Sequence, residues 1–135
     1  MSDPSNASDD RVFAAPVGPL AKAPLSNGVR VGDWILVAGQ IGIDDNGKVV
    51  PGGVAGETRA CLLSLQSILE SLGSSLSDVV QTRIYLTDFD QYGAFNEVYR
   101  EFFTAPYPIR ATVGTPELAL GAAIEIEATA VASRR

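Results

Sequence analysis

The stretch AAIEIEATAVA at residues 122–132 predicts a strand with apolar side chains on both of its faces. Its pattern is typical of a β-strand, in which successive side chains point to opposite faces. One face carries Ile124, Ile126, Ala128 and Ala130. The opposite face carries Ala123, Thr129 and Val131. Because both faces are partly apolar, the sheet that contains this strand needs a cover on each side.

Two other stretches have the spacing of an amphipathic helix. The first is predicted over residues 54–72, with Gly73 as its C-terminal stop. Its apolar face consists of Cys61, Leu62, Leu65, Ile68, Leu69 and Leu72. The second follows Asp88 or Asp90, either of which can cap it, and ends before Pro106. Its apolar face consists of Phe95, Val98, Tyr99 and Phe102.

The remaining apolar runs predict strands. One is expected at residues 11–17, and two more lie within GVRVGDWILVAGQIG, where Gly32 and Asp33 form a tight turn. Further strands are expected at residues 78–87 and 109–113, before the last one. This order predicts an α+β domain, a single mixed β-sheet with two helices packed on one face. A homo-oligomer would cover the other face.

The length of 135 residues fits one domain. The polar start MSDPSNASDD predicts a disordered tail at residues 1–10, which leaves a single domain at residues 11–135. No apolar run approaches the roughly 18 residues of a membrane span, and the start does not resemble a signal peptide. We therefore expect a cytoplasmic protein with no membrane partner.

Charge and residue types exclude several kinds of function. The net charge is −6, and the ten basic residues are scattered, so no nucleic-acid partner is expected. The absence of histidine removes Ser-His-Asp and Cys-His catalysis and every histidine metal site. The single cysteine, Cys61, lies in a helical apolar pattern, which favours a buried packing thiol over a nucleophile.

The segment GQIGIDDNGK comes close to a phosphate-binding loop. Gly42, Gly47 and Lys48 have the required spacing, but Val49 stands where a magnesium-binding hydroxyl is needed. The acidic pair Asp44-Asp45 would repel phosphate, and the segment lacks the spacing and terminal glutamate of a calcium loop. A hairpin turn or tight loop at Asn46-Gly47 explains the segment better.

Two charged positions near the C-terminus can carry chemistry. Arg110 opens a strand in PYPIRATVG, and is either a surface charge or a clamp for an anionic small molecule. Glu125 and Glu127 share one strand face, as a solvated pair or with Glu125 as a buried general acid and base beside Arg110. Their strands are consecutive and joined by a short link, so we expect them to pair.

Four segments resemble the Rid family, the reactive-intermediate deaminases also called YjgF-like: APLSNGVRVGDWILVAGQIG, NEVYREFF, PIRATVG and IEIEATAV. The similarity covers residues 19–132. It implies a chorismate-mutase-like fold and a homotrimer with a cleft at each subunit interface. It also implies hydrolysis of enamines and 2-imino acids to 2-keto acids and ammonia, like a 2-iminobutanoate/2-iminopropanoate deaminase. Neither a metal nor an organic cofactor is implied.

The resemblance assigns roles to four positions of this chain. Arg110 matches the arginine that binds the substrate carboxylate, and Glu125 matches the glutamate that orients water. Gly39 matches the glycine whose backbone lines the cleft, and Asn96 matches an asparagine of the second helix.

Three positions depart from the family pattern. Leu25 replaces a frequent tyrosine, Ala38 replaces a serine, and Thr112 replaces a frequent cysteine. The first two changes remove hydroxyl groups, so we expect a more apolar cleft that favours larger apolar imines. They also keep open an alternative function, that of a trimeric binding protein that senses a small carboxylate metabolite without turnover.

Overall fold

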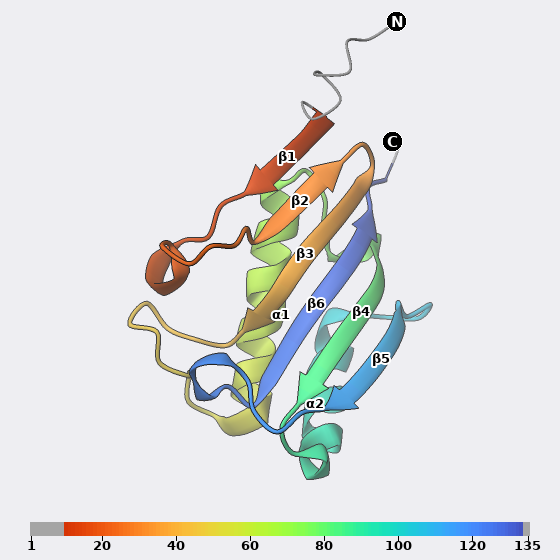
Figure 1. The fold of residues 1–135 in the computed structure, drawn as a ribbon. Coiled ribbons are helices and arrows are strands. Elements are labelled where there is room, and N and C mark those ends of the chain that lie inside the picture. The colour runs from red at the N-terminus through yellow and green to blue at the C-terminus, as the bar shows by residue number, and fades with distance from the viewer. Residues whose placement is uncertain (1–9, 134–135) are drawn as a thin grey trace, which may run out of the picture.

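The computed structural model describes residues 10–133, which form one six-stranded sheet with two helices (Figure 1). The strands are β1 (Arg11–Ala14), β2 (Gly28–Val31), β3 (Trp34–Ile41), β4 (Val79–Leu86), β5 (Ile109–Gly114) and β6 (Ile124–Val131). The helices are α1 (Gly53–Ser71) and α2 (Tyr92–Phe102). The expected tail at residues 1–10 lies outside the described residues except for Asp10, which directly precedes β1.

The sheet is mixed, as predicted, with the order β1-β2-β3-β6-β4-β5. Strands β4 and β5 run parallel, and every other neighbouring pair of described strands runs antiparallel. A parallel pair needs a crossover connection, which α2 supplies between β4 and β5. The last strand, β6, then returns to lie between β3 and β4, where it is buried in the middle of the sheet.

Local turn chemistry places the hairpins where the sequence predicts them. Gly32 has a φ of 62°, and the two-residue turn that it forms with Asp33 brings Val31 opposite Trp34. In the next loop the Asp44 carboxylate accepts hydrogen bonds from the backbone N–H groups of Asn46 and Lys48, at 2.8 and 3.0 Å. This loop is a hairpin turn, as expected, closed by the antiparallel bridge between Ile43 and Val49.

Helix α1 begins and ends one residue earlier than residues 54–72. Its apolar face contributes side chains with no exposed surface, namely Cys61, Leu62, Leu65 and Leu69. At its C-terminal end the guanidinium of Arg30 donates to the carbonyl of Leu72 at 2.8 Å, so β2 is tied to the helix. Arg30 thus satisfies a carbonyl that the helix itself leaves without a partner.

Helix α2 does not begin directly after Asp88 or Asp90, the two residues that were expected to cap it. The Asp88 carboxylate accepts from the backbone N–H of Asp90, and this caps the 3₁₀ turn Phe89–Gln91 that precedes the helix. The helix itself starts at Tyr92 without a side-chain cap. The first strand is also shorter than residues 11–17 and ends at Ala14, two residues before Pro16, which has no N–H to donate to a sheet.

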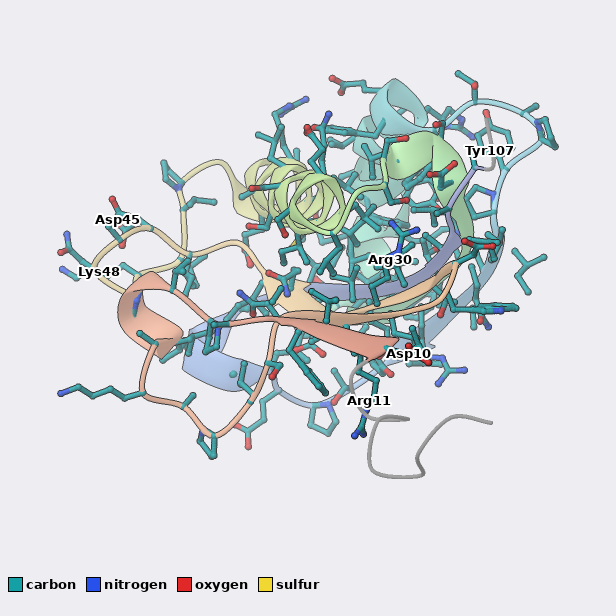
Figure 2. The ribbon with its side chains drawn as sticks, turned by 90° about the horizontal axis from the view of Figure 1, so that it is seen from above. Asp10, Arg11, Arg30, Asp45, Lys48 and Tyr107 are labelled. Atoms are coloured by element: carbon teal, nitrogen blue, oxygen red, sulfur yellow. The ribbon has the colours of Figure 1, made fainter. Side chains whose placement is uncertain are left out.

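Both helices lie on the same side of the sheet, which Figure 2 shows nearly edge-on with Arg30 on the helix side and Arg11 on the opposite side. We call the uncovered side the open face. Burial alternates along β6, with its buried residues under the helices. Large apolar side chains remain exposed on the open face, among them Phe13, Trp34, Leu36 and Ile109.

Candidate active site

Arg110 lies on the edge strand β5, and its side chain reaches α2. Its Cζ atom is 5.5, 5.1 and 5.0 Å from the ring centroids of Tyr92, Phe95 and Tyr99. Its Nη2 atom donates a hydrogen bond to the Tyr92 hydroxyl at 2.6 Å. Aromatic faces attract a guanidinium at these distances, so α2 holds the charge in one place.

The spacing of α2 explains this arrangement. Tyr92, Phe95 and Tyr99 are three and four residues apart, so their rings follow one side of the helix. The buried hydroxyls of Tyr99 and Thr82 share a hydrogen bond of 2.8 Å, which fixes the helix to β4. Thr82 is in register with Arg110, and both therefore point to the helix side of the sheet.

A cavity of about 350 Å³ lies against this arginine. Its walls come from α2 and from the segment that leads into β5, and they comprise Tyr92, Asn96, Tyr99, Arg100, Tyr107, Pro108 and Arg110. The structure thus brings Arg110 and Asn96 together, two of the predicted site residues. Thr112 points to the same side of β5 as Arg110, two residues further along the strand, and is half-buried.

Glu125 and Gly39 lie against each other on the neighbouring strands β6 and β3, away from Arg110. An added Cβ at Gly39 would collide with the carboxylate oxygen Oε2 of Glu125 and lie 2.6 Å from its Cδ. Burial raises the pKa of the Glu125 carboxyl above its usual value, and the negative charge of Glu127 raises it further. Glycine at position 39 therefore gives this carboxylate the space that it occupies.

The two glutamates of β6 share the open face, as predicted, but differ in their partners. Glu127 accepts a hydrogen bond from the Tyr85 hydroxyl at 2.8 Å and lies 3.8 Å from a guanidinium nitrogen of Arg83. Among residues 10–133, no hydrogen bond or ion pair of the Glu125 carboxylate is found. A carboxylate with a raised pKa and no partner is the better candidate for proton transfer.

Leu25, Ala38 and Gly39 also come together, around a second cavity of about 330 Å³. Other walls of this cavity are supplied by α1 and by the loops around β3, including Asn27, Gln40, Ser64 and Ser67. Leu25 is 45% exposed. Leu25 and Ala38, the two positions that lack the hydroxyl groups of the family pattern, therefore line the same cavity.

The expectation that the strands of Arg110 and Glu125 pair is wrong, because β4 lies between β5 and β6. The crossover through α2 places β5 on the outer side of β4, and β6 inserts on its inner side. Glu125 alternates with the core residues Ile124 and Ile126, so it faces away from the helices, whereas Arg110 faces them.

Distance also separates the two charges. Two strand spacings of about 4.8 Å and three residue rises of about 3.3 Å place the Cα atoms of Arg110 and Glu125 roughly 14 Å apart. Within one chain, the two side chains start from opposite faces at this separation and cannot hold the same small substrate. A site that uses both groups needs two chains.

The sequence pattern predicts that Phe95 and Tyr99 lie on the apolar face of the helix and gives no role to Tyr92, so the aromatic support of Arg110 is not among the predictions. The signal was available, because three aromatic residues at i, i+3 and i+7 precede a lone arginine on the next strand. Among the described residues, no three Cys, Asp or Glu side chains gather in a group that could hold a metal ion.

Comparison with known proteins gives consistent matches over most of the chain. The model of a family described as endoribonuclease L-PSP matches residues 16–132. A human protein named 2-iminobutanoate/2-iminopropanoate deaminase is 37% identical over 122 residues, which cover 90% of this chain and 89% of the relative. A RutC family protein from Pyrococcus abyssi is 39% identical over 116 residues, which cover 85% of this chain and 87% of the relative.

Solved structures match as well. A member of the YjgF/YER057c/UK114 family from Mycobacterium tuberculosis has a TM-score of 0.79 and 31% identity, with 90% of this chain and 98% of that chain covered. RidA from the Antarctic bacterium Psychrobacter sp. PAMC 21119 has a TM-score of 0.79 and 30% identity, with 88% and 97% covered. The chain therefore belongs to the endoribonuclease L-PSP family, the YjgF/RidA family that its sequence motifs resemble.

Proposed function

We propose that this protein hydrolyses 2-imino acids and their enamine tautomers to 2-keto acids and ammonia. The observation that carries the proposal is the guanidinium of Arg110, held against aromatic rings beside a cavity and free of any acidic partner among residues 10–133. Such a group suits a small carboxylate. The human relative and several other mammalian relatives are named 2-iminobutanoate/2-iminopropanoate deaminase, which supports the reaction class.

The chemistry follows from the two charged groups. Arg110 takes the substrate carboxylate through two parallel hydrogen bonds, a geometry that lysine cannot reproduce. Glu125 accepts a proton from water while the water oxygen bonds to C2, and returns this proton to the imine nitrogen, which gives a carbinolamine. Glu125 then moves the carbinolamine hydroxyl proton to the amine, the C2–N bond breaks as the C2–O double bond forms, and ammonia leaves the keto acid. The raised pKa of Glu125 suits it to both accept and return this proton.

We further propose that each site lies between two subunits, with Arg110 from one chain and Glu125 from its neighbour. The opposite orientation of the two side chains supports this, as does the apolar open face. On that face Trp34, Leu36 and Ile109 are 55%, 47% and 69% exposed. A homotrimer of chorismate-mutase-like subunits would bury these side chains and bring the two half-sites together.

The remaining predicted positions complete the proposed site. Asn96 would bind the imine nitrogen or water from the Arg110 side, and Thr112 would line the same side. Gly39 would present its backbone from the Glu125 side. Leu25 and Ala38 would make that side less polar than hydroxyl-bearing residues at the same positions, which would favour imines with larger apolar side chains over 2-aminoacrylate.

RNA is not a proposed partner, although the family model is described as an endoribonuclease. The chain carries a net charge of −6, and RNA binding requires Lys and Arg to converge on the phosphate backbone. In the described residues, no helix is long and apolar enough to cross a membrane. The cytoplasm is the proposed location, which is consistent with a buried, unpaired cysteine.

The test uses an amino-acid oxidase to generate 2-imino acids in the presence of semicarbazide. The protein is expected to divert imine from semicarbazone to keto acid. Arg110→Ala and Arg110→Lys should both lose most of this activity, at a cost of about 2–4 kcal/mol in transition-state stabilisation. Near wild-type activity of Arg110→Lys would contradict the clamp. Keto-acid binding without turnover would favour the carboxylate-sensing alternative.

A further inference from the structure

Tyr92 makes the one hydrogen bond found for the guanidinium of Arg110 among residues 10–133. The Nη2 atom of Arg110 donates to the Tyr92 hydroxyl at 2.6 Å, and both side chains border the 350 Å³ cavity. A guanidinium has five N–H donors, of which this contact uses one. An edge with two parallel N–H groups therefore stays available for a carboxylate.

The aromatic rings alone do not determine the direction of that edge. They lie 5.0 to 5.5 Å from Cζ and attract the positive charge, but a guanidinium can turn in its own plane without losing this attraction. A hydrogen bond at one nitrogen prevents such a turn. The Tyr92 hydroxyl thus selects which edge of Arg110 faces the cavity.

Tyr92 is itself held in place. Its ring stacks on Phe89 with a centroid separation of 5.6 Å and an interplanar angle of 10°. On its other side it packs against Phe95 at 6.4 Å. The hydroxyl therefore sits on a side chain that is fixed at the first residue of α2, where a small rotation would move it away from Arg110.

We propose that Tyr92 is a positioning residue, which orients the guanidinium of Arg110 for two-point binding of the substrate carboxylate. The identity of the substrate rests on the proposed function, whereas the orientation of Arg110 does not. Because Tyr92 acts through Arg110, its hydroxyl should matter only while Arg110 is present. A hydroxyl that only supported the fold would matter equally in either case.

The test is a double-mutant cycle with wild type, Tyr92→Phe, Arg110→Ala and the double variant. Calorimetry gives the Kd for 2-oxobutanoate, a carboxylate product, and the semicarbazide assay gives kcat and KM. Tyr92→Phe keeps the ring and removes one oxygen, so we expect Kd and KM to rise about tenfold and kcat to change less than about twofold. In the Arg110→Ala background the same substitution should change nothing.

Ser71→Ala is the control for Kd. It removes an exposed hydroxyl that donates to the carbonyl of Ile68 near the end of α1, outside both halves of the proposed site, so the Kd for 2-oxobutanoate should stay at the wild-type value. An unchanged Kd in Tyr92→Phe overturns the inference, and so does a further loss of binding when Tyr92→Phe is added to Arg110→Ala. Wild-type binding without turnover overturns only the proposed reaction, and the calorimetric cycle still decides the role of Tyr92. Absence of any 2-oxobutanoate binding by the wild type overturns both.

Discussion

Glu125 and Glu127 differ in what surrounds them, although they lie two residues apart on the same face of β6. Tyr85 and Arg83 contact Glu127, so its charge is compensated. Glu125 lies against the backbone of Gly39, where burial and the neighbouring charge raise its pKa. Glu125 is thus a better candidate for proton transfer than Glu127, because Gly39 leaves room for its carboxylate.

The space at Gly39 gives a first prediction. Gly39→Ala should displace the Glu125 carboxylate, because the new Cβ would overlap it, and turnover should fall by about 10²-fold or more with little loss of stability. Gly42→Ala is the matched comparison, since its Cβ would lie 2.9 Å from the backbone of Glu57 in α1. It should lower the free energy of unfolding instead. Urea unfolding and the semicarbazide assay separate the two effects, and equal stability loss in both variants would contradict this account.

The raised pKa of Glu125 predicts a pH-dependent stability. The folded protein binds the proton more tightly than the unfolded chain, so the stability of the protonated form is present below the ordinary pKa of 4.5. It is lost as the pH rises through the raised pKa. Glu125→Gln cannot ionise, so its melting temperature should exceed that of wild type at neutral pH and the difference should shrink as the medium becomes acidic. Melting curves at fixed protein concentration test this, and a difference independent of pH would refute it.

Helix bounds and turns depend mainly on residues that are close in the sequence, and they could be predicted from it. Helix α1 begins and ends within one residue of its expected bounds, because 3.6-residue periodicity is visible in the chain itself. The turn at Gly32 was predictable for a similar reason, since a positive φ needs glycine. The pairing of β5 with β4 could not be predicted, because it depends on the direction of the crossover through α2.

In the candidate site, too, local features could be predicted from the sequence and long-range ones could not. Arg110 and Asn96 were singled out from motifs, and the structure brings them to one cavity. The separation of Glu125 from Arg110 could not be predicted, since a two-residue period gives the faces of each strand but not which strand lies between them. Tyr92 was missed because its hydroxyl contact depends on how α2 lies across β5.

The hydrogen bond from Arg30 of β2 to the end of α1 predicts an effect on stability. Arg30→Ala should lower the free energy of unfolding by about 1–3 kcal/mol, because the carbonyl of Leu72 loses its charged donor. Arg100→Ala removes an exposed arginine that pairs with Glu97 one turn away, and this should cost at most about 0.5 kcal/mol. Chemical unfolding of both variants measures the difference. Equal costs would show that the Arg30 contact does not stabilise the helix end.

The apolar open face predicts that the protein is an oligomer. Leu36 lies on that face and is 47% exposed, whereas Leu63 lies on the outer side of α1 and is 52% exposed. Leu36→Glu should dissociate the assembly, because it buries a charge without a partner, and activity should be lost with it. Leu63→Glu should remain assembled and active. Light scattering at micromolar concentration tests this, and a folded wild-type monomer would end the idea.

The proposed site between two subunits makes a quantitative prediction for mixed assemblies. Arg110→Ala and Glu125→Gln should each be inactive alone, since every site lacks one of its two groups. In a trimer co-assembled from equal amounts of the two variants, each site receives an intact Arg110 from one subunit with a probability of one half. It receives an intact Glu125 from the neighbouring subunit with the same probability, so about one quarter of wild-type activity should return. If both groups came from the same chain, mixing would restore no activity at all, because no single chain in the mixture carries both.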